Sequence, residues 1–280
     1  MVFLLVLFLA YAAFCYQAAN AYLHPWRETY PAPLDVKEAK VGNVPVWATP
    51  GLLDGHPSEA VFVLAHGYGG TRATWNGLLH DLRKAGIDAV APAMPGQDTN
   101  PDDSVGFGKK EARTIIECAD WCRAKGAKKV VGLGVSLGGA ATWLASAEDP
   151  KALDGVISDA AFALFTEAME KAFSYRLPLG GVILRPVVWI AKAKSGIDPG
   201  TIRPIEAAAA WKGRPALVIQ GTADRLIVPS NGERLAEAAG CPIWRVEGAE
   251  HAMDYSTDPE GYAKRVIQFA RAIKSTKGSF

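Results

Sequence analysis

Gly134-Val135-Ser136-Leu137-Gly138 places a serine between two glycines, where a β-branched stretch gives way to a helix-forming one. A serine on such a strand-to-helix turn is held with its hydroxyl exposed, as a nucleophile must be. Gly134 and Gly138 allow the sharp turn, because a Cβ at either position would meet the neighbouring backbone. The first turn of a helix also offers N–H groups to an anion that forms beside the serine. The segment therefore predicts a nucleophilic Ser136.

A serine hydroxyl needs a base that takes its proton, and the base needs a third group that fixes its tautomer. His251 is the one histidine downstream of Ser136, so we predict that it is the base. For the acid we favour Asp224, which directly follows the apolar run at residues 216–220. Reacting groups of open α/β sheets lie just beyond the carboxyl ends of strands. Asp159, at the end of an earlier strand-like run, remains the alternative acid.

Attack on a carbonyl creates an oxyanion, which two main-chain N–H groups must stabilise. Leu137, the residue after the serine, is predicted to supply one of them. Tyr68 should supply the other, from a loop in which Gly67 and two further glycines allow the backbone to turn inward. We interpret His66, which begins this loop, as a buried residue that holds the backbone in shape and not as a second base.

Four segments together resemble the α/β-hydrolase superfamily: His66-Gly67-Tyr68-Gly69-Gly70, Gly134-Val135-Ser136-Leu137-Gly138, Gly221-Thr222-Ala223-Asp224 and Gly248-Ala249-Glu250-His251. Within it the chain looks most like the serine aminopeptidase and monoacylglycerol-lipase-like branch, especially its small bacterial members with an N-terminal membrane segment. The resemblance runs from about residue 44 to the C-terminus. It implies that Ser136, Asp224 and His251 form a catalytic triad and that Tyr68 and Leu137 form the oxyanion hole.

One segment departs from this pattern. Many relatives carry an Arg-Gly-His-Gly-Ser-like sequence after the fourth strand, whereas this chain has Pro92-Ala93-Met94-Pro95-Gly96-Gln97-Asp98. The departure leaves the substrate preference open and does not touch the predicted catalytic residues.

Strand-like and helix-like runs alternate from residue 44 onward, which predicts an α/β fold with a mostly parallel central sheet and helices on both faces. Strands are expected at 44–48, 60–65, 88–91, 129–134, 155–159, 216–220 and 242–246. Helices are expected at 74–85, 108–124, 137–147, 230–239 and 259–275. The length of 280 residues suits one such domain, over residues 44–280.

Residues 161–200 are more than one crossover helix requires, so we expect a small helical lid there. It should hold a helix at 162–173, a turn at 178–181 and a second helix at 182–193. Its apolar residues either pack on the domain or line an acyl pocket and touch a bilayer, with Arg185, Lys192 and Lys194 near lipid headgroups. A lid this short favours a small or medium substrate over a polymer.

Residues 1–22 form an apolar stretch whose length lies between a secretory signal and a membrane span. An uncleaved membrane anchor fits it best, because no Lys or Arg precedes the run. The small-x-small pattern Ala19-Asn20-Ala21 supports the alternative of a cleaved signal and a secreted protein. The basic residues Arg27, Lys37 and Lys40 follow the run, which slightly favours a cytoplasmic domain. Residues 23–43 are then a linker.

The net charge and the cysteines limit which partners and cofactors we expect. The formal net charge of +1 gives no reason to expect a nucleic acid, and the oligomeric state stays open. The cysteines at 15, 118, 122 and 241 lack metal-ligand spacing and are expected to be free thiols. The predicted chemistry requires no metal and no cofactor.

These features predict a serine hydrolase that cleaves carboxylic esters of small or medium acyl substrates. The same residues serve an aminopeptidase or amidase, for which Glu111 or Glu167 could hold the substrate amine. They also serve an acyltransferase, in which an alcohol replaces water. A binding protein on this fold usually lacks one of the three residues, and a dehalogenase would carry aspartate in place of Ser136.

Overall fold

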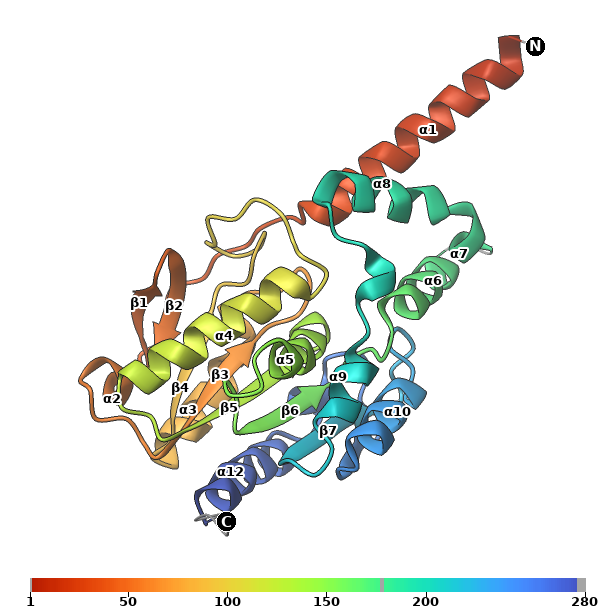
Figure 1. Cartoon of the computed structure of the whole chain (residues 1–280). Helices are drawn as coiled ribbons and strands as arrows, with labels where there is room; N and C mark the ends of the chain where they lie inside the picture. Colours follow the sequence, from red (N-terminus) through yellow and green to blue (C-terminus); the bar gives the residue numbers. More distant parts are fainter. Residues whose placement is uncertain (1, 177–178, 276–280) are drawn as a thin grey trace.

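The computed structural model of the protein describes residues 2–176 and 179–275, and its centre is an eight-stranded sheet (Figure 1). The strand order is β1-β2-β4-β3-β5-β6-β7-β8. β2 is antiparallel to both of its neighbours, and the other strand pairs are parallel. The strands are β1 (Lys37–Val41), β2 (Val44–Ala48), β3 (Ala60–Ala65), β4 (Asp88–Pro92), β5 (Lys129–Val135), β6 (Gly155–Asp159), β7 (Ala216–Gly221) and β8 (Ile243–Val246).

Helices cover both faces of this sheet, so the predicted α/β class is confirmed. They are α1 (Val2–Leu23), α2 (Pro50–Leu53), η1 (Arg72–Trp75), α3 (Asn76–Lys84), α4 (Lys109–Ala124), α5 (Leu137–Glu148), α6 (Phe165–Arg176), α7 (Gly180–Ile183), α8 (Arg185–Ser195), η2 (Pro199–Thr201), α9 (Pro204–Ala210), α10 (Ser230–Ala239), α11 (Asp254–Thr257) and α12 (Pro259–Ser275).

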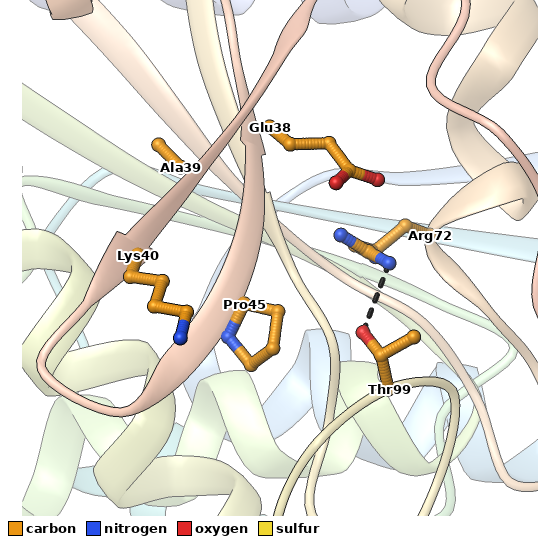
Figure 2. A pocket seen from close by; sticks show the side chains of 6 residues that line it. All are labelled: Glu38, Ala39, Lys40, Pro45, Arg72 and Thr99. Atoms are coloured by element: carbon orange, nitrogen blue, oxygen red, sulfur yellow. Dashed lines mark hydrogen bonds between the residues drawn. The ribbon is translucent and has the colours of Figure 1, made fainter.

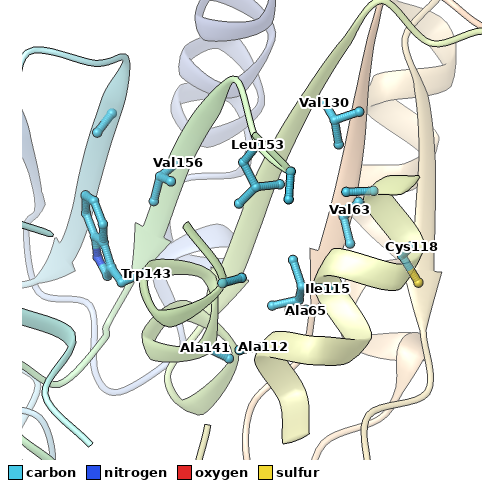
Figure 3. Close-up of a cluster of buried hydrophobic side chains, with 14 of the residues drawn as sticks. Val63, Ala65, Ala112, Ile115, Cys118, Val130, Ala141, Trp143, Leu153 and Val156 are labelled. Carbon is cyan, nitrogen blue, oxygen red and sulfur yellow. The ribbon is translucent and has the colours of Figure 1, made fainter. Parts of the chain in front are cut away.

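Strand β3 shows how the sheet builds a core on each side. Its residues are all buried, and successive side chains point to opposite faces. Val61 and Val63 join the cluster under α4 and α5, part of which Figure 3 shows. Phe62 and Leu64 join the second cluster, under α3 and α12. A strand buried on both faces is a continuous apolar run in the sequence, which is why the predicted bounds of β3 agree with the observed ones.

Two elements differ from expectation. Strand β1 lies in the segment expected to be a linker, and it pairs with β2 through a tight turn at Gly42. The helix expected at 74–85 divides into the short η1 and α3. The remaining predicted strands and helices outside the lid lie within a residue of the observed bounds.

Helices α6, α7 and α8 form an excursion between β6 and β7, which we call the cap. The cap has three helices where the sequence predicted two lid helices. Pro178 of the predicted turn lies outside the described residues. A third apolar cluster lies between the cap and the sheet, with Phe162, Phe165 and Val187 among its members. Figure 1 shows α1 passing beside α8 and extending away from the sheet. Helix α1 as a whole is long and apolar enough to cross a membrane, a property that a signal sequence shares.

Candidate active site

Ser136 lies on the turn between β5 and α5, where its backbone takes a left-handed φ of 54°. A side chain other than glycine's is strained there, and such strain is typical of functional sites. The tightness of the turn explains both flanking glycines. A Cβ on Gly134 would overlap the carbonyl of Gly138, and a Cβ on Gly138 would overlap the carbonyl of Ala65 at the end of β3. The turn is fixed further by the Ser136 N–H, which donates to the carbonyl of Asp159 over 2.8 Å.

Three side chains from separate strand ends form one hydrogen-bonded chain. His251 Nε2 lies 2.9 Å from Ser136 Oγ, and His251 Nδ1 lies 2.8 Å from Asp224 Oδ2. The Asp224 carboxylate can only accept, so Nδ1 carries the proton and Nε2 accepts from the serine hydroxyl. The main-chain N–H groups of Leu226 and Ile227 donate to the other Asp224 oxygen over 2.9 and 2.8 Å. The carboxylate is therefore buried, satisfied and held in one orientation.

Asp159, the alternative acid, does not bond to His251. One of its oxygens accepts from the Tyr262 hydroxyl over 2.9 Å, and its carboxyl pairs with that of Asp254. Both carboxyls are buried, and neither oxygen of Asp254 has a donor other than the neighbouring carboxyl within the described part of the chain. Burial, together with the neighbouring carboxyl, raises the pKa of Asp159 well above its usual range. Burial beside a second carboxyl thus favours the protonated form of Asp159.

The loop that carries Tyr68 lies directly against the serine. A Cβ on Gly67 would lie 3.3 Å from the Cβ of Ser136, so only glycine brings this backbone so close. On the other side, Leu137 is the first residue of α5, and its N–H belongs to the first turn, whose donors have no acceptor within the helix. Both predicted oxyanion residues thus flank Ser136.

Several side chains support this loop, and of these the sequence analysis singled out only His66. Gln97 accepts from the N–H of Gly69, and Asp98 forms a buried ion pair with Arg72 at 2.9 Å. His66 donates to the Gly67 carbonyl and accepts from the Met94 N–H over 3.1 Å. Burial lowers the pKa of His66 to about 4, so its ring is neutral and its structural interpretation fits. Residues 92–98, which depart from the family pattern, therefore brace the oxyanion side of the site.

Other hollows lie away from Ser136. One lies over β1 and β2, where Glu38, Lys40 and Pro45 face Arg72, which donates to Thr99 over 3.0 Å (Figure 2). Arg72 is almost fully buried and bonded to Asp98. This hollow therefore lies behind the side chains that support the Tyr68 loop.

A narrow apolar crevice of about 10 Å³ lies beneath the cap. Its walls come from the end of α1, the cap and the loop before α4, and include Tyr22, Phe107, Phe165 and Met169. The surrounding cluster also contains Leu137, the residue next to Ser136. The crevice has room for about one water molecule, so it is part of the packed apolar interior beneath the cap.

The carboxylates considered for an amine are engaged elsewhere. Glu111 is fully buried and accepts from the N–H groups of Gly106 and Gly108 over 2.9 and 2.7 Å. Glu167 pairs with Arg234 at the surface. Within residues 2–176 and 179–275, no group of three or more His, Cys, Asp or Glu side chains could hold a metal ion.

Comparisons with solved structures agree with this architecture. An esterase of Pyrococcus furiosus superposes with a TM-score of 0.70 at 16% identity, over 90% of this chain and 98% of the other. A thermophilic esterase of Thermogutta terrifontis gives 0.64 at 16% identity, over 88% and 97%. A bacterial membrane phospholipase A gives 0.59 at 18% identity, over 98% and 96%. At such identities the likeness concerns the fold.

Curated proteins offer no match to the sequence. A family model does match, over residues 62–265, which include Ser136, Asp224 and His251. The chain belongs to the alpha/beta hydrolase family, and its sheet, helices and cap form the fold of that family.

Proposed function

We propose that the protein is a serine hydrolase that cleaves carboxylic esters of small or medium acyl substrates through an acyl-enzyme on Ser136. The observation that carries this proposal is the unbroken hydrogen-bonded chain from Ser136 through His251 to Asp224. The esterases and the phospholipase among the similar structures support an ester as the substrate.

The reaction follows from the positions of these groups. As Ser136 attacks the ester carbonyl, His251 Nε2 takes the hydroxyl proton, and Asp224 stabilises the imidazolium that results. The N–H groups of Tyr68 and Leu137 stabilise the oxyanion of the tetrahedral intermediate. His251 then donates its proton to the leaving alcohol. In the second half, His251 activates water, which attacks the acyl-enzyme and releases the acid.

We further propose that residues 1–22 anchor the protein to a membrane, with the catalytic domain over residues 44–280. Strand β1 joins residues 37–41 to the sheet, and His24 and Arg27 bond to the loop before α4, so the connecting segment is itself attached to the domain. Residues 161–200, including the cap, act as the lid. The order of basic residues after α1 favours the cytoplasmic side.

Of the alternatives, acyl transfer uses the same groups and differs only in the acceptor. Peptidase activity has weaker support, because Glu111 and Glu167 are both engaged in other interactions. Product analysis with added glycerol separates hydrolysis from transfer.

The decisive experiment is hydrolysis of a p-nitrophenyl acyl ester by Ser136→Ala. We expect kcat to fall by about 10⁶, since the other triad members act only through the nucleophile. A fluorophosphonate probe should label the wild-type protein and not the variant. Ser256→Ala is the control, because Ser256 is exposed and bonds only locally, to Met253. Activity or labelling that survives Ser136→Ala would refute the proposal.

A further inference from the structure

The loop that carries His251 is attached to the domain on each side of the imidazole. Upstream, the carbonyl of the buried Ala249 accepts from the N–H of Ala223 over 3.0 Å. Downstream, the residues at 252 and 253 are exposed, and Asp254, which begins α11, is the first buried residue. The position of the imidazole therefore depends on what holds the Asp254 side chain.

The partner of the Asp254 carboxyl is a second carboxyl. Within the described part of the chain, neither Asp254 oxygen receives a bond from an N–H group or a hydroxyl. Its carboxyl hydrogen-bonds with that of Asp159, at the end of β6. Asp159 also accepts from the Tyr262 hydroxyl of α12. Because an ionised carboxylate cannot donate, the bond between the two aspartates exists only while one of them carries a proton.

Asp159 is at the same time attached to the nucleophile. Its main-chain carbonyl accepts from the N–H of Ser136 over 2.8 Å. The bond between the two carboxyls thus joins the strand end that fixes Ser136 to the segment that follows His251. A movement of this segment away from β6 would lengthen the 2.9 Å contact along which the serine proton passes. Tyr255 bonds to Asp81 of α3 over 2.8 Å, so α11 keeps a second attachment when the carboxyl bond is lost.

The surroundings of the two carboxyls favour one shared proton. Burial raises the pKa of both, and for Asp159 the neighbouring carboxyl adds to this effect. Three further ionisable groups act on them. The Tyr262 hydroxyl lowers the pKa of Asp159 by donating to it, the Asp224 carboxylate raises the pKa of both, and His251 lowers that of Asp254. Once the proton is lost, two adjacent buried carboxylates repel each other.

We propose that Asp159 and Asp254 are positioning residues that share one proton, and that this proton holds the His251 loop against the strand end that carries Ser136. This inference rests on the proposed esterase function and gives that site an internal dependence on pH. The bond is present while the proton is bound. As the pH rises through the ionisation of the pair, the carboxylates repel, the imidazole moves away from the hydroxyl, and turnover falls.

The first test is the dependence of kcat on pH with p-nitrophenyl butyrate as substrate and Ser136→Ala as the blank for spontaneous hydrolysis. The wild type should lose activity on the alkaline side by about 10², which is the cost of misplacing a reacting group by about 1 Å. Asp254→Asn should keep its activity there, because the amide donates to Asp159 without a bound proton. Coincident alkaline limbs in the wild type and Asp254→Asn would overturn the inference.

Glu250→Gln is the matched control for this comparison. It removes one carboxylate from the same loop, next to His251, but at an exposed position. Its pH profile should coincide with that of the wild type. A shift in Glu250→Gln equal to that in Asp254→Asn would assign the effect to the charge of the loop, and the shared proton would be wrong.

The second test is Tyr262→Phe, which keeps the buried ring and removes the hydroxyl. Without this donor, ionised Asp159 is less stable, so the pair retains its proton to higher pH. The alkaline limb should move upward by about one to two pH units, as expected for a hydrogen bond to a charged group. A purely structural role would lower kcat at every pH and leave the limb in place. A limb that stays or moves down would contradict the proposal.

The third test, at neutral pH, removes the bond altogether. Asp254→Ala should lower kcat by about 10² and leave KM unchanged, because the base is displaced and the substrate site is not. Asp254→Asn should restore kcat. Wild-type kcat in Asp254→Ala, or a change in KM alone, would overturn the positioning role. If Asp254→Ala does not fold, Asp254→Asn and Tyr262→Phe decide the question by their pH profiles.

A measurement without substrate separates this inference from the esterase function. The proton on His251 Nδ1, bonded to Asp224, gives a low-field proton resonance while the triad is assembled. If the wild type cleaves the ester but the pH profiles coincide, the esterase stands and the shared proton is wrong. If the wild type cleaves no ester, the esterase fails and the resonance decides. Persistence to higher pH in Asp254→Asn than in the wild type supports the positioning pair, and loss at the same pH overturns it.

Discussion

At the scale of single residues, two aspartates at neighbouring strand ends have different surroundings. Asp224 bonds to His251, whereas Asp159 bonds to Tyr262 and Asp254. We expect Asp224→Asn to lower kcat by about 10⁴, because an amide no longer fixes the imidazole tautomer. Asp159→Asn should stay within a few-fold of the wild type, since the amide still accepts from Tyr262. The measurement is ester hydrolysis at neutral pH.

The reverse result, a large loss in Asp159→Asn and a small one in Asp224→Asn, would assign the acid to the earlier strand. Folding of both variants is checked by thermal unfolding, so that a lost activity is not a lost fold. The residues that we propose as nucleophile, base and acid could be selected from the sequence, because each follows a recognisable strand and they occur in the chain order that α/β-hydrolases use. Gln97 and Asp98 could not, since their role depends on contacts across the fold.

The carboxyl pair of Asp159 and Asp254 predicts a dependence of stability on pH. Burial raises the pKa of both groups, so the folded protein keeps a proton that the unfolded chain loses at about pH 4. Their contribution is full below that pH and is lost as the pH rises through the folded-state pKa. We expect the Tm of the wild type to decline from weakly acidic toward alkaline pH.

Asp254→Asn should flatten this decline, because the amide donates to the Asp159 carboxylate and no proton need be bound. Thermal unfolding across the pH range, with ionic strength held constant, measures the difference between the two slopes. Parallel curves for the wild type and Asp254→Asn would show that the pair does not carry the shared proton.

At the scale of elements, the turn between β5 and α5 depends on the absence of side chains. A Cβ on Gly138 would overlap the Ala65 backbone, which no side-chain rotation can relieve. We expect Gly138→Ala to lower the free energy of unfolding by about 1–3 kcal/mol, as overpacking does, and to displace Ser136. Gly200→Ala is the control, because the added Cβ would meet only the exposed Asp198 side chain, at 3.3 Å. Urea unfolding and esterase activity report the two effects.

Elements buried on both faces were predictable, and those at the edge were not. Strand β3 is apolar along its whole length and was located to the residue. Strand β1 reads Lys-Glu-Ala-Lys-Val, lies at the edge of the sheet and is mostly exposed, so it lacks the apolar run that marks a strand. The cap was recognised by its excess length, but its second predicted helix is divided into α7 and α8, with Pro186 in the first turn of α8.

At the scale of the whole molecule, α1 packs on the cap, and Tyr22 near its end stacks on Tyr68 of the loop beside Ser136. Ala19 is fully buried in the third apolar cluster, to which Val187 and Ala191 of α8 also belong, and α1 and α8 contact each other. A small residue lets two helices approach closely. Ala19→Leu should therefore separate α1 from α8 without making the segment less apolar. Ala10→Leu adds the same side chain at an exposed position of α1.

We expect Ala19→Leu to lower the Tm in detergent and to accelerate amide hydrogen exchange in α8, while β5 exchanges as in the wild type. The reason is that the cap is stabilised through the third apolar cluster, to which α1 contributes, and not by the sheet alone. Ala10→Leu should leave both measurements unchanged. If the two variants are indistinguishable, α1 is attached to the domain only through the chain, and the connection between α1, cap and active site is absent.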